Sequence, residues 1–135
     1  MHPVLVDAGA LIALLDSSDA THERAVSALA SIREPLVTVW PALTEAMYLL
    51  RDTRRGPETL IDMISDAAVG LATVDIQEWP RIKALMQQYR DLPMDFADAV
   101  IVRVAEREGW HRILTFDVHF RVYRLPRKAR FRVVA

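Results

Sequence analysis

Short apolar runs alternate with longer amphipathic segments along most of the chain. Four runs are rich in valine, leucine and isoleucine and have the length of buried strands; they lie at 3–7, 36–39, 71–74 and 112–116. A fifth run, at 131–134, predicts a short strand at the edge of a sheet. The segments between them predict helices at 8–15, 20–32, 41–53, 58–68, 77–90 and 95–108.

Local signals mark several helix ends. Asp19 is placed to cap the helix at 20–32, and Pro41 suits the first turn of the next helix. Pro93 breaks the chain before Asp95 opens the last helix, and Gly109 is typical of a helix C-terminal stop.

The alternation of strands and helices predicts an α/β fold. Such a chain forms a central, mainly parallel sheet of about five strands covered on both faces, a three-layer α/β/α sandwich. The segment between the second and third strands is longer than a minimal crossover, so its two helices are expected to pack as a hairpin. No repeat, linker or low-complexity segment divides the chain, and residues 1–135 are predicted to form a single domain.

Composition supports a folded domain and excludes several classes of function. A hydrophobic content of 52% with 26% charged residues is enough for a sizeable core. The absence of cysteine excludes disulfides, thiolate nucleophiles and cysteine-based zinc sites. No apolar run approaches the ~20 residues of a membrane helix, and the apolar start lacks the basic residues of a signal peptide. We therefore expect a cytoplasmic protein with no membrane partner.

The net charge of −1 hides an asymmetry. Six of the 17 basic side chains, and none of the 18 acidic ones, lie after Asp117. A basic C-terminal segment on an acidic body indicates a polyanionic partner held near a site that needs cations. The alternative is an ordinary solvated edge strand, where lysine and arginine are common.

Two aspartates directly follow predicted strands. Asp7 ends the first strand and Asp117 ends the fourth. If the two strands are parallel, both carboxylates lie at the carboxyl edge of the sheet, where α/β proteins bind ligands. The alternative for each is a helix N-cap, because aspartate after a strand often caps the next helix.

Two further acids occupy helices. Glu45 lies among apolar residues and is either held rigidly near the sheet or exposed on a narrow solvent face with Tyr48. Asp95 and Asp98 share one helix face, with Asp95 the natural N-cap and Asp98 in the first turn. The helix after Asp98 is almost entirely apolar, so we expect it in the core, with its N-terminus and Asp98 at the sheet edge.

Carboxylates brought this close raise one another's pKa, and a divalent cation is the usual compensation. Oxygen ligands without histidine or cysteine favour Mg²⁺ or Mn²⁺ over Zn²⁺. Such a site supports metal-assisted phosphodiester hydrolysis without a protein nucleophile. A phosphate-binding loop and a dinucleotide-binding motif are both missing from the sequence. An aspartyl phosphatase would need a second aspartate two residues after Asp7, where Gly9 stands.

The order of four motifs resembles the PIN domain, specifically the VapC-like ribonuclease toxins of prokaryotic toxin–antitoxin pairs. The motifs are Leu5–Gly9, Leu43–Ala46, Asp95–Ala99 and Leu114–Phe120. The resemblance covers essentially the whole chain. It implies a Mg²⁺- or Mn²⁺-dependent endoribonuclease.

The resemblance also implies roles for particular residues. Asp7, Glu45, Asp98 and Asp117 match the acidic quartet of the family. Three of them are implied as the main metal ligands, namely Asp7, Asp98 and Asp117, and Glu45 is implied to hold a water or a second metal. Thr115 matches a polar position that orients a carboxylate or the attacking water, and Asp95 matches an auxiliary acid.

The family further implies a homodimer and a small antitoxin protein. The antitoxin would lay a helix across an apolar groove, for which the first four helices are candidates. The chain departs from many relatives at Ala8–Gly9, where they carry a small hydroxyl residue. Two alternatives stay open: a catalytically silent PIN-like interaction module, and a DNA-directed or structure-specific nuclease of the same fold.

Overall fold

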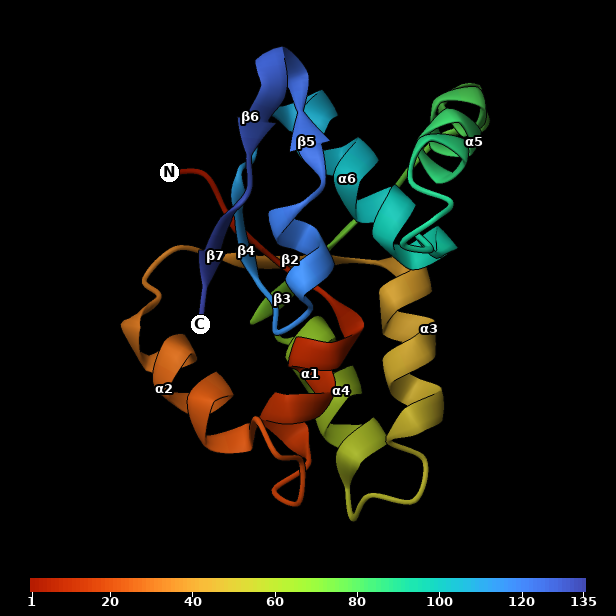
Figure 1. Ribbon diagram of the computed structural model, residues 1–135. Helices are drawn as coiled ribbons and strands as arrows, with labels where there is room; N and C mark the ends of the chain where they lie inside the picture. Colours follow the sequence, from red (N-terminus) through yellow and green to blue (C-terminus); the bar gives the residue numbers. More distant parts are fainter.

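Five parallel strands form the central sheet of the computed structural model, which describes residues 1–135. Their order across the sheet is β3-β2-β1-β4-β7. The strands are β1 (Val4–Val6), β2 (Leu36–Val39), β3 (Val69–Ala72), β4 (Arg112–Leu114) and β7 (Arg132–Val134). β1 lies at the centre of the sheet and pairs in parallel with β4, which is labelled in Figure 1.

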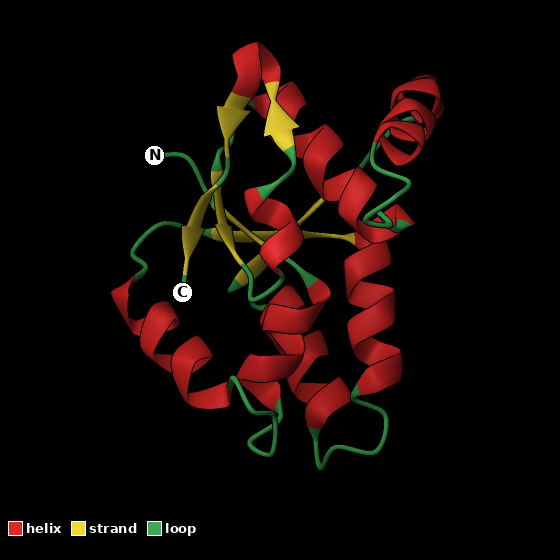
Figure 2. Cartoon of the chain, viewed as in Figure 1, coloured by secondary structure: helices red, strands yellow, loops and turns green.

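Six α-helices cover the sheet. They are α1 (Ala8–Leu15), α2 (His22–Ser31), α3 (Trp40–Leu49), α4 (Gly56–Ser65), α5 (Trp79–Gln88) and α6 (Phe96–Glu108). Helices α1 to α4 lie on one side of the sheet, and α5 and α6 lie on the other (Figures 1 and 2). The chain passes outward from β1 to β2 and β3, and then returns across the sheet to β4. With right-handed crossovers, the helices of the outward path and those of the return path lie on opposite faces of the sheet. The predicted α/β sandwich is confirmed.

The apolar runs form the core, as their lengths predict. All of β1 is fully buried, because helices lie over both of its faces. Six residues of α6 are buried as well: Ala99, Val100, Ile101, Val102, Val104 and Ala105. The expectation that α6 is a central helix is therefore confirmed, and its N-terminus reaches the carboxyl edge of the sheet.

Several boundaries differ from the predicted ones. The third strand lies at Val69–Ala72 rather than 71–74, because its parallel register pairs Val69 with Leu36. The second helix begins at His22, since Asp19 accepts hydrogen bonds from the backbone and hydroxyl of Thr21 and so closes a turn before it. The prediction that Asp19 caps this helix is wrong.

Three other helices differ from their predicted bounds. The fourth lies at Gly56–Ser65 rather than 58–68. The third ends at Leu49 rather than 53. A short 3-10 turn, η1 (Ile76–Glu78), precedes α5, which then ends at Gln88 rather than 90. None of the helices is both long and apolar enough to span a bilayer.

The sequence pattern missed a hairpin near the C-terminus. Strands β5 (Arg124–Leu125) and β6 (Ala129–Arg130) pair antiparallel, apart from the main sheet, around the tight turn η3 (Pro126–Lys128). A 3-10 turn, η2 (Val118–Arg121), precedes the hairpin. Two-residue strands are too short to show a periodic pattern. The edge strand predicted at 131–134 is confirmed as β7.

Candidate active site at the carboxyl edge of the sheet

Asp7 directly follows β1, as predicted, whereas Asp117 lies three residues beyond the end of the neighbouring strand β4, which ends at Leu114 rather than at residue 116. Asp7 is 6% exposed, and its Oδ1 accepts a hydrogen bond of 2.9 Å from the Ala10 amide at the start of α1. Asp117 likewise accepts a bond of 2.9 Å from the His119 amide at the start of η2. Both aspartates are therefore helix caps, and both also lie at the ligand-binding edge. The two roles are compatible, because each carboxylate offers about four lone-pair positions.

Thr115 connects these two carboxylate positions. Its side chain is buried, and its hydroxyl donates to Oδ2 of Asp7. The Oγ1 atom of Thr115 in turn accepts a bond of 3.0 Å from the Asp117 amide. One hydroxyl thus fixes the orientation of Asp7 and the backbone that carries Asp117.

Asp98 enters the site from the first turn of α6. The N-cap Asp95 accepts a hydrogen bond of 2.8 Å from the Asp98 amide, which holds this turn in place. The Oδ2 atom of Asp98 accepts a bond of 3.1 Å from the hydroxyl of Tyr123. The Tyr123 ring is fully buried and packs edge-on against Tyr89 and Phe120.

The carboxylates influence one another's titration. Burial raises the pKa of Asp7 to about 6, aided by the charges of Asp117 and Glu45, although bonds from Thr115 and Ala10 oppose the rise. Burial also raises the pKa of Asp98 to about 7. The negative charges of Asp95, Asp117 and Asp7 add to this rise, and the bond from Tyr123 opposes it.

Glu45 lies on α3 at the rim of the same site. Its side chain is exposed, as the solvent-face alternative predicts. Partial desolvation and the charge of Asp95 nevertheless raise its pKa, and its own charge raises that of Asp7. Glu45 is therefore exposed to solvent and also interacts electrostatically with the other carboxylates of the site. We use "acidic cluster" for the set that the structure brings together: Asp7, Glu45, Asp95, Asp98 and Asp117.

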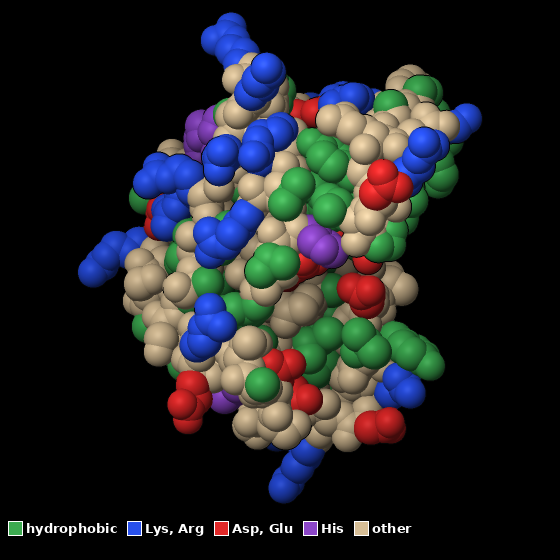
Figure 3. Space-filling view, viewed as in Figure 1, with side chains coloured by type: hydrophobic (Ala, Val, Ile, Leu, Met, Phe, Trp, Pro, Cys, Tyr) green, Lys and Arg blue, Asp and Glu red, His purple; other side chains and the backbone are tan.

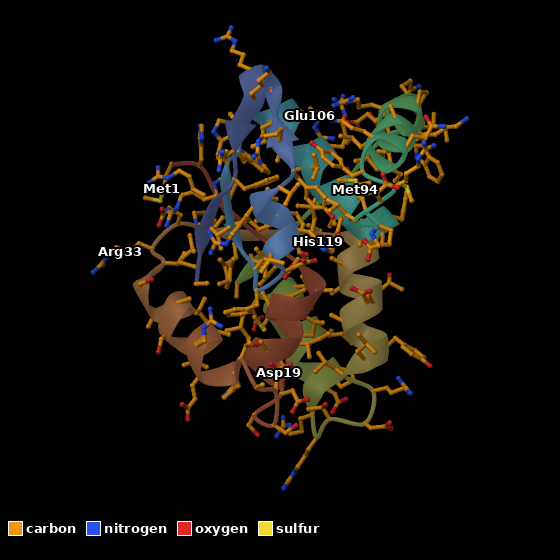
Figure 4. All side chains as sticks on the ribbon, viewed as in Figure 1. Met1, Asp19, Arg33, Met94, Glu106 and His119 are labelled. Atoms are coloured by element: carbon orange, nitrogen blue, oxygen red, sulfur yellow. The ribbon has the colours of Figure 1, made fainter.

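No lysine or arginine forms an ion pair with the acidic cluster. Among the ion-pair distances, the one that involves the cluster joins Nδ1 of His119 to Oδ1 of Asp117 at 3.5 Å. Figure 3 shows Asp and Glu side chains gathered beside the histidine that Figure 4 labels as His119. Like charges held together without a cationic partner are the chemistry that a divalent cation compensates.

The donor set fits Mg²⁺ or Mn²⁺. It consists of hard oxygen atoms, but as the side chains stand no three of them lie in a group that could hold a metal ion. An open arrangement suits an ion that keeps several waters and takes few protein ligands. The residues that would hold it are Asp7, Asp98 and Asp117.

The comparison with protein families decides the family of this chain. The model described as PIN domain matches residues 4–125, which include every member of the acidic cluster. The chain belongs to the PIN domain family.

Two relatives extend this finding. Ribonuclease VapC26 of Mycobacterium tuberculosis (strain ATCC 25618 / H37Rv) is 28% identical over 135 residues, which covers 97% of this chain and 99% of the relative. The crystal structure of Mycobacterium tuberculosis VapC20, a sarcin-ricin loop cleaving toxin, superposes with a TM-score of 0.78 at 21% identity. The match covers 85% of this chain and 90% of that one, and at this identity it shows the PIN fold.

Tyr123 is the residue of this PIN domain site that the sequence did not reveal. It lies in a basic, irregular segment with no strand or helix pattern, and 25 residues separate it from Asp98. The only signal in the sequence is an aromatic residue among arginines close to Asp117. Its contact with Asp98 depends on how η2 folds back over α6, which no local pattern specifies.

Replacing Tyr123 with phenylalanine should move the acid limb of the pH–rate profile of this PIN domain to higher pH. The hydroxyl lowers the pKa of Asp98, so its loss raises that pKa further above its usual range. Profiles of cleavage rate against pH, with Mn²⁺, measure the shift. Tyr89→Phe is the matched control, because the Tyr89 hydroxyl accepts from the Arg124 amide and touches no carboxylate. An identical shift in both variants would contradict a specific role for Tyr123.

Proposed function

We propose that this PIN-domain chain is a Mg²⁺- or Mn²⁺-dependent endoribonuclease that acts as the toxin of a toxin–antitoxin pair. The observation that carries the proposal is the acidic cluster, which holds its carboxylates at one sheet edge without a cationic partner. The similarity to a protein named ribonuclease VapC26 over nearly the whole length of both chains supports RNA as the substrate.

The proposed role of each residue in the acidic cluster follows from its position in the site. Asp7, Asp98 and Asp117 would hold the cation, while Thr115 and Tyr123 keep Asp7 and Asp98 in fixed rotamers. A bound divalent cation supplies charge stabilisation to the phosphate and makes a water molecule more acidic. Glu45, at the exposed rim, would hold a water or a second ion, and its raised pKa suits a residue that accepts a proton from that water.

In the overall reaction, a water oxygen forms a bond to phosphorus and one bridging P–O bond breaks. The proton of the attacking water passes to a base at the rim, and the leaving ribose oxygen takes up a proton. The site needs no protein nucleophile for this displacement, in keeping with the absence of cysteine from the chain. Asp95 would act as an auxiliary residue, since it orients the first turn of α6 and adds negative charge beside Asp98.

Cleavage of matched oligonucleotides tests the proposal directly. Purified protein is incubated with RNA and DNA of the same sequence, with Mg²⁺, with Mn²⁺ and with EDTA. We expect cleavage of RNA that requires the cation and is lost in EDTA. Cleavage of DNA at an equal rate would favour a DNA-directed nuclease of this fold.

Metal binding distinguishes the proposed ribonuclease from the alternative, a catalytically silent interaction module. Calorimetric titration with Mn²⁺ should show tighter binding to the wild type than to Asp98→Asn. Equal affinities together with no cleavage would establish a catalytically silent interaction module instead.

We also propose a homodimer formed through exposed aromatic residues. Trp40, Trp79 and Phe96 are 54%, 49% and 37% exposed, and the rings of Trp79 and Phe96 lie 5.6 Å apart. All three rings line one hollow of about 300 Å³ next to the acidic cluster. Covering such a surface with a second copy removes apolar area from water.

The antitoxin is proposed to occupy the adjoining groove between α3 and α4, which shares only Trp40 with the hollow proposed for the dimer. This groove has a volume of about 450 Å³ and is lined mainly by Leu43, Met47, Ile61 and Ile64, with Trp40 at one end. An amphipathic helix with apolar residues at helical spacing fits such a groove.

We also propose that the protein is located in the cytoplasm, where it would meet its RNA substrate.

Trp79→Glu should convert the dimer to a monomer. A carboxylate placed among Trp40 and Phe96 would have to be desolvated on association, which disfavours the dimer. Light scattering coupled to size exclusion measures the mass, and Ile76→Glu, at a position 70% exposed, is the control. A wild-type protein that is already monomeric at high concentration would contradict the proposed dimer.

A further inference from the structure

The basic side chains of this protein fall into two groups by their partners. Most cations of α5, α6 and β4 are paired with acids. Arg81 pairs with Glu106, and Arg103 and Arg107 both pair with Glu78. Arg112 of β4 pairs with Glu34. Arg81, Arg103 and Arg107 belong to one network of ion pairs, Arg112 and Glu34 form a separate pair, and little of this positive charge is free for a ligand.

The cations after Asp117 have no such partners. Five of them are exposed and lie within 4 Å of no carboxylate, and we call this set the C-terminal basic surface: Arg121, Arg127, Lys128, Arg130 and Arg132. Arg124 is left out because one nitrogen of its guanidinium donates to the carbonyls of residues 121, 122 and 123. It serves the fold, whereas the five others face solvent.

The β5–β6 hairpin presents these cations in a conformation that is unfavourable for the protein alone. Arg127 and Lys128, at the tip, have φ values of 62° and 60°, in the left-handed region that non-glycine residues seldom occupy. On the strands, Arg130 lies opposite Arg124, and like charges directly opposite destabilise a pair. A polyanion bound along the hairpin would screen the repulsion between Arg124 and Arg130.

One short stretch of chain links the acidic cluster to the C-terminal basic surface, whose last member, Arg132, lies beside Arg112 at the start of β4. Asp117 opens η2, which contains Arg121. Tyr123 then contacts Asp98 directly, and β5 begins at the next residue. In Figure 3, Lys and Arg side chains gather over the β5–β6 hairpin and the neighbouring strands, on one side of the acidic side chains near His119.

We propose that the C-terminal basic surface binds the phosphate backbone of the RNA beside the cleavage site. This inference rests on the proposed ribonuclease function and deepens it. The cation held by the acidic cluster contacts one phosphate, while the exposed arginines and lysine neutralise phosphates on one flank of it. Backbone contacts of this kind position the strand without reading its sequence.

Salt-dependent binding tests the proposal. The triple variant Arg127→Asn, Lys128→Asn and Arg130→Gln removes three charges, with asparagine chosen where the left-handed backbone must be kept. The matched control is Arg33→Gln, Arg54→Gln and Arg55→Asn, which removes three exposed charges, one of them from a left-handed residue with φ 59°. Figure 4 shows Arg33 pointing away from the site, and the loop of Arg54 and Arg55 lies at the far end of α3 (Figure 1).

Fluorescence anisotropy of a labelled RNA oligonucleotide, in EDTA, gives the dissociation constant over a range of salt. We expect the triple variant to bind about 10- to 100-fold more weakly at low salt, with the slope of log K against log salt reduced by about 2. The control should stay within about twofold of wild type. With Mn²⁺, KM for the oligonucleotide should rise while kcat at saturation stays near that of wild type.

The outcomes separate this inference from the proposed function. Wild-type cleavage with unchanged binding and KM in the triple variant would overturn the inference and leave the ribonuclease intact. RNA binding that depends on these residues in a protein that cleaves nothing would overturn the function and leave the RNA surface standing. Unchanged RNA binding together with lost binding of polyglutamate would overturn it in favour of an acidic polypeptide partner. Urea unfolding of each variant confirms that the hairpin still folds.

Discussion

Asp98→Asn is expected to lower the rate of RNA cleavage by at least about 10³-fold while making the metal-free protein more stable at pH 8. Asparagine keeps the shape of the side chain and can still accept the hydrogen bond from Tyr123. It removes the negative charge that a divalent cation needs from this position. Single-turnover cleavage of a labelled RNA with Mn²⁺ measures the loss of rate.

The gain in stability follows from the raised pKa of Asp98. Its carboxyl titrates at about 7 in the folded protein, against an ordinary value of 3.8, so the folded state disfavours the charged form. The contribution of Asp98 to the free energy of unfolding is therefore greatest at low pH, and it falls as the pH rises from about 4 to 7. Asparagine cannot ionise, so the variant escapes this loss at pH 8.

The size of the gain is smaller than the pKa shift alone suggests. A shift of this extent corresponds to an upper bound of ~4 kcal/mol. Because Asp98 is only partly buried and solvent screens its neighbours, we expect ~1–2 kcal/mol, or ~5 °C in Tm. Thermal melts in EDTA at pH 5 and pH 8 measure it, and the gain should be less than half as large at pH 5, where the folded state has lost only the part of the stability that falls between about pH 4 and 5.

Added Mn²⁺ gives a second test of the same variant. The cation should raise the Tm of the wild type and leave that of Asp98→Asn nearly unchanged, since ligand binding stabilises only a protein that binds it. Asp66→Asn, at an exposed position after α4, is the control for the loss of one charge. Full cleavage activity in Asp98→Asn would remove Asp98 from the metal site.

The sequence predicted those parts of the site that depend on strand order. Asp7 and Asp117 end apolar runs, and parallel strands bring such ends to one edge whatever the details of packing. Asp98 could be placed because the helix that follows is apolar enough to require a central position. Each of these inferences needs only two properties: which segments are buried, and in which direction each strand or helix runs. The spacing of apolar residues along the chain encodes both.

Other features depended on contacts between distant segments. The start of β3 is set by its register with β2, so the apolar run at 71–74 misplaced the strand by two residues. The contact between Tyr123 and Asp98 and the pairing of β5 with β6 are tertiary features of short segments. No periodic pattern within such segments distinguishes a hairpin from a loop.

Thr115→Val is expected to cost ~2–4 kcal/mol of stability at pH 8 and to weaken Mn²⁺ binding ~10- to 100-fold. Valine has nearly the same shape as threonine but no hydroxyl. Its introduction leaves Oδ2 of the buried Asp7 carboxylate without its donor, although the Ala10 amide still donates to Oδ1, and leaves the amide of Asp117 without its acceptor. Urea unfolding in EDTA and calorimetric titration with Mn²⁺ measure the two effects.

The loss of stability should depend on pH in a defined direction. The bond from Thr115 lowers the pKa of Asp7, so its removal raises that pKa beyond about 6. At pH 8 the charged carboxylate then lacks its strongest stabilising contact. At pH 5 Asp7 is largely protonated, so the variant should lose less there, and the remaining loss comes from the Asp117 amide.

Two companion variants make this prediction specific. Thr115→Ser restores the hydroxyl and should recover most of the metal affinity. Thr38→Val removes another fully buried hydroxyl, which donates to the carbonyl of Val6 at 2.7 Å and touches no carboxylate. It should lose ~1 kcal/mol equally at both pH values. If Thr115→Val and Thr38→Val showed the same pH dependence and the same Mn²⁺ affinity, Thr115 would be only a core residue, and Asp7 would need another explanation for its orientation.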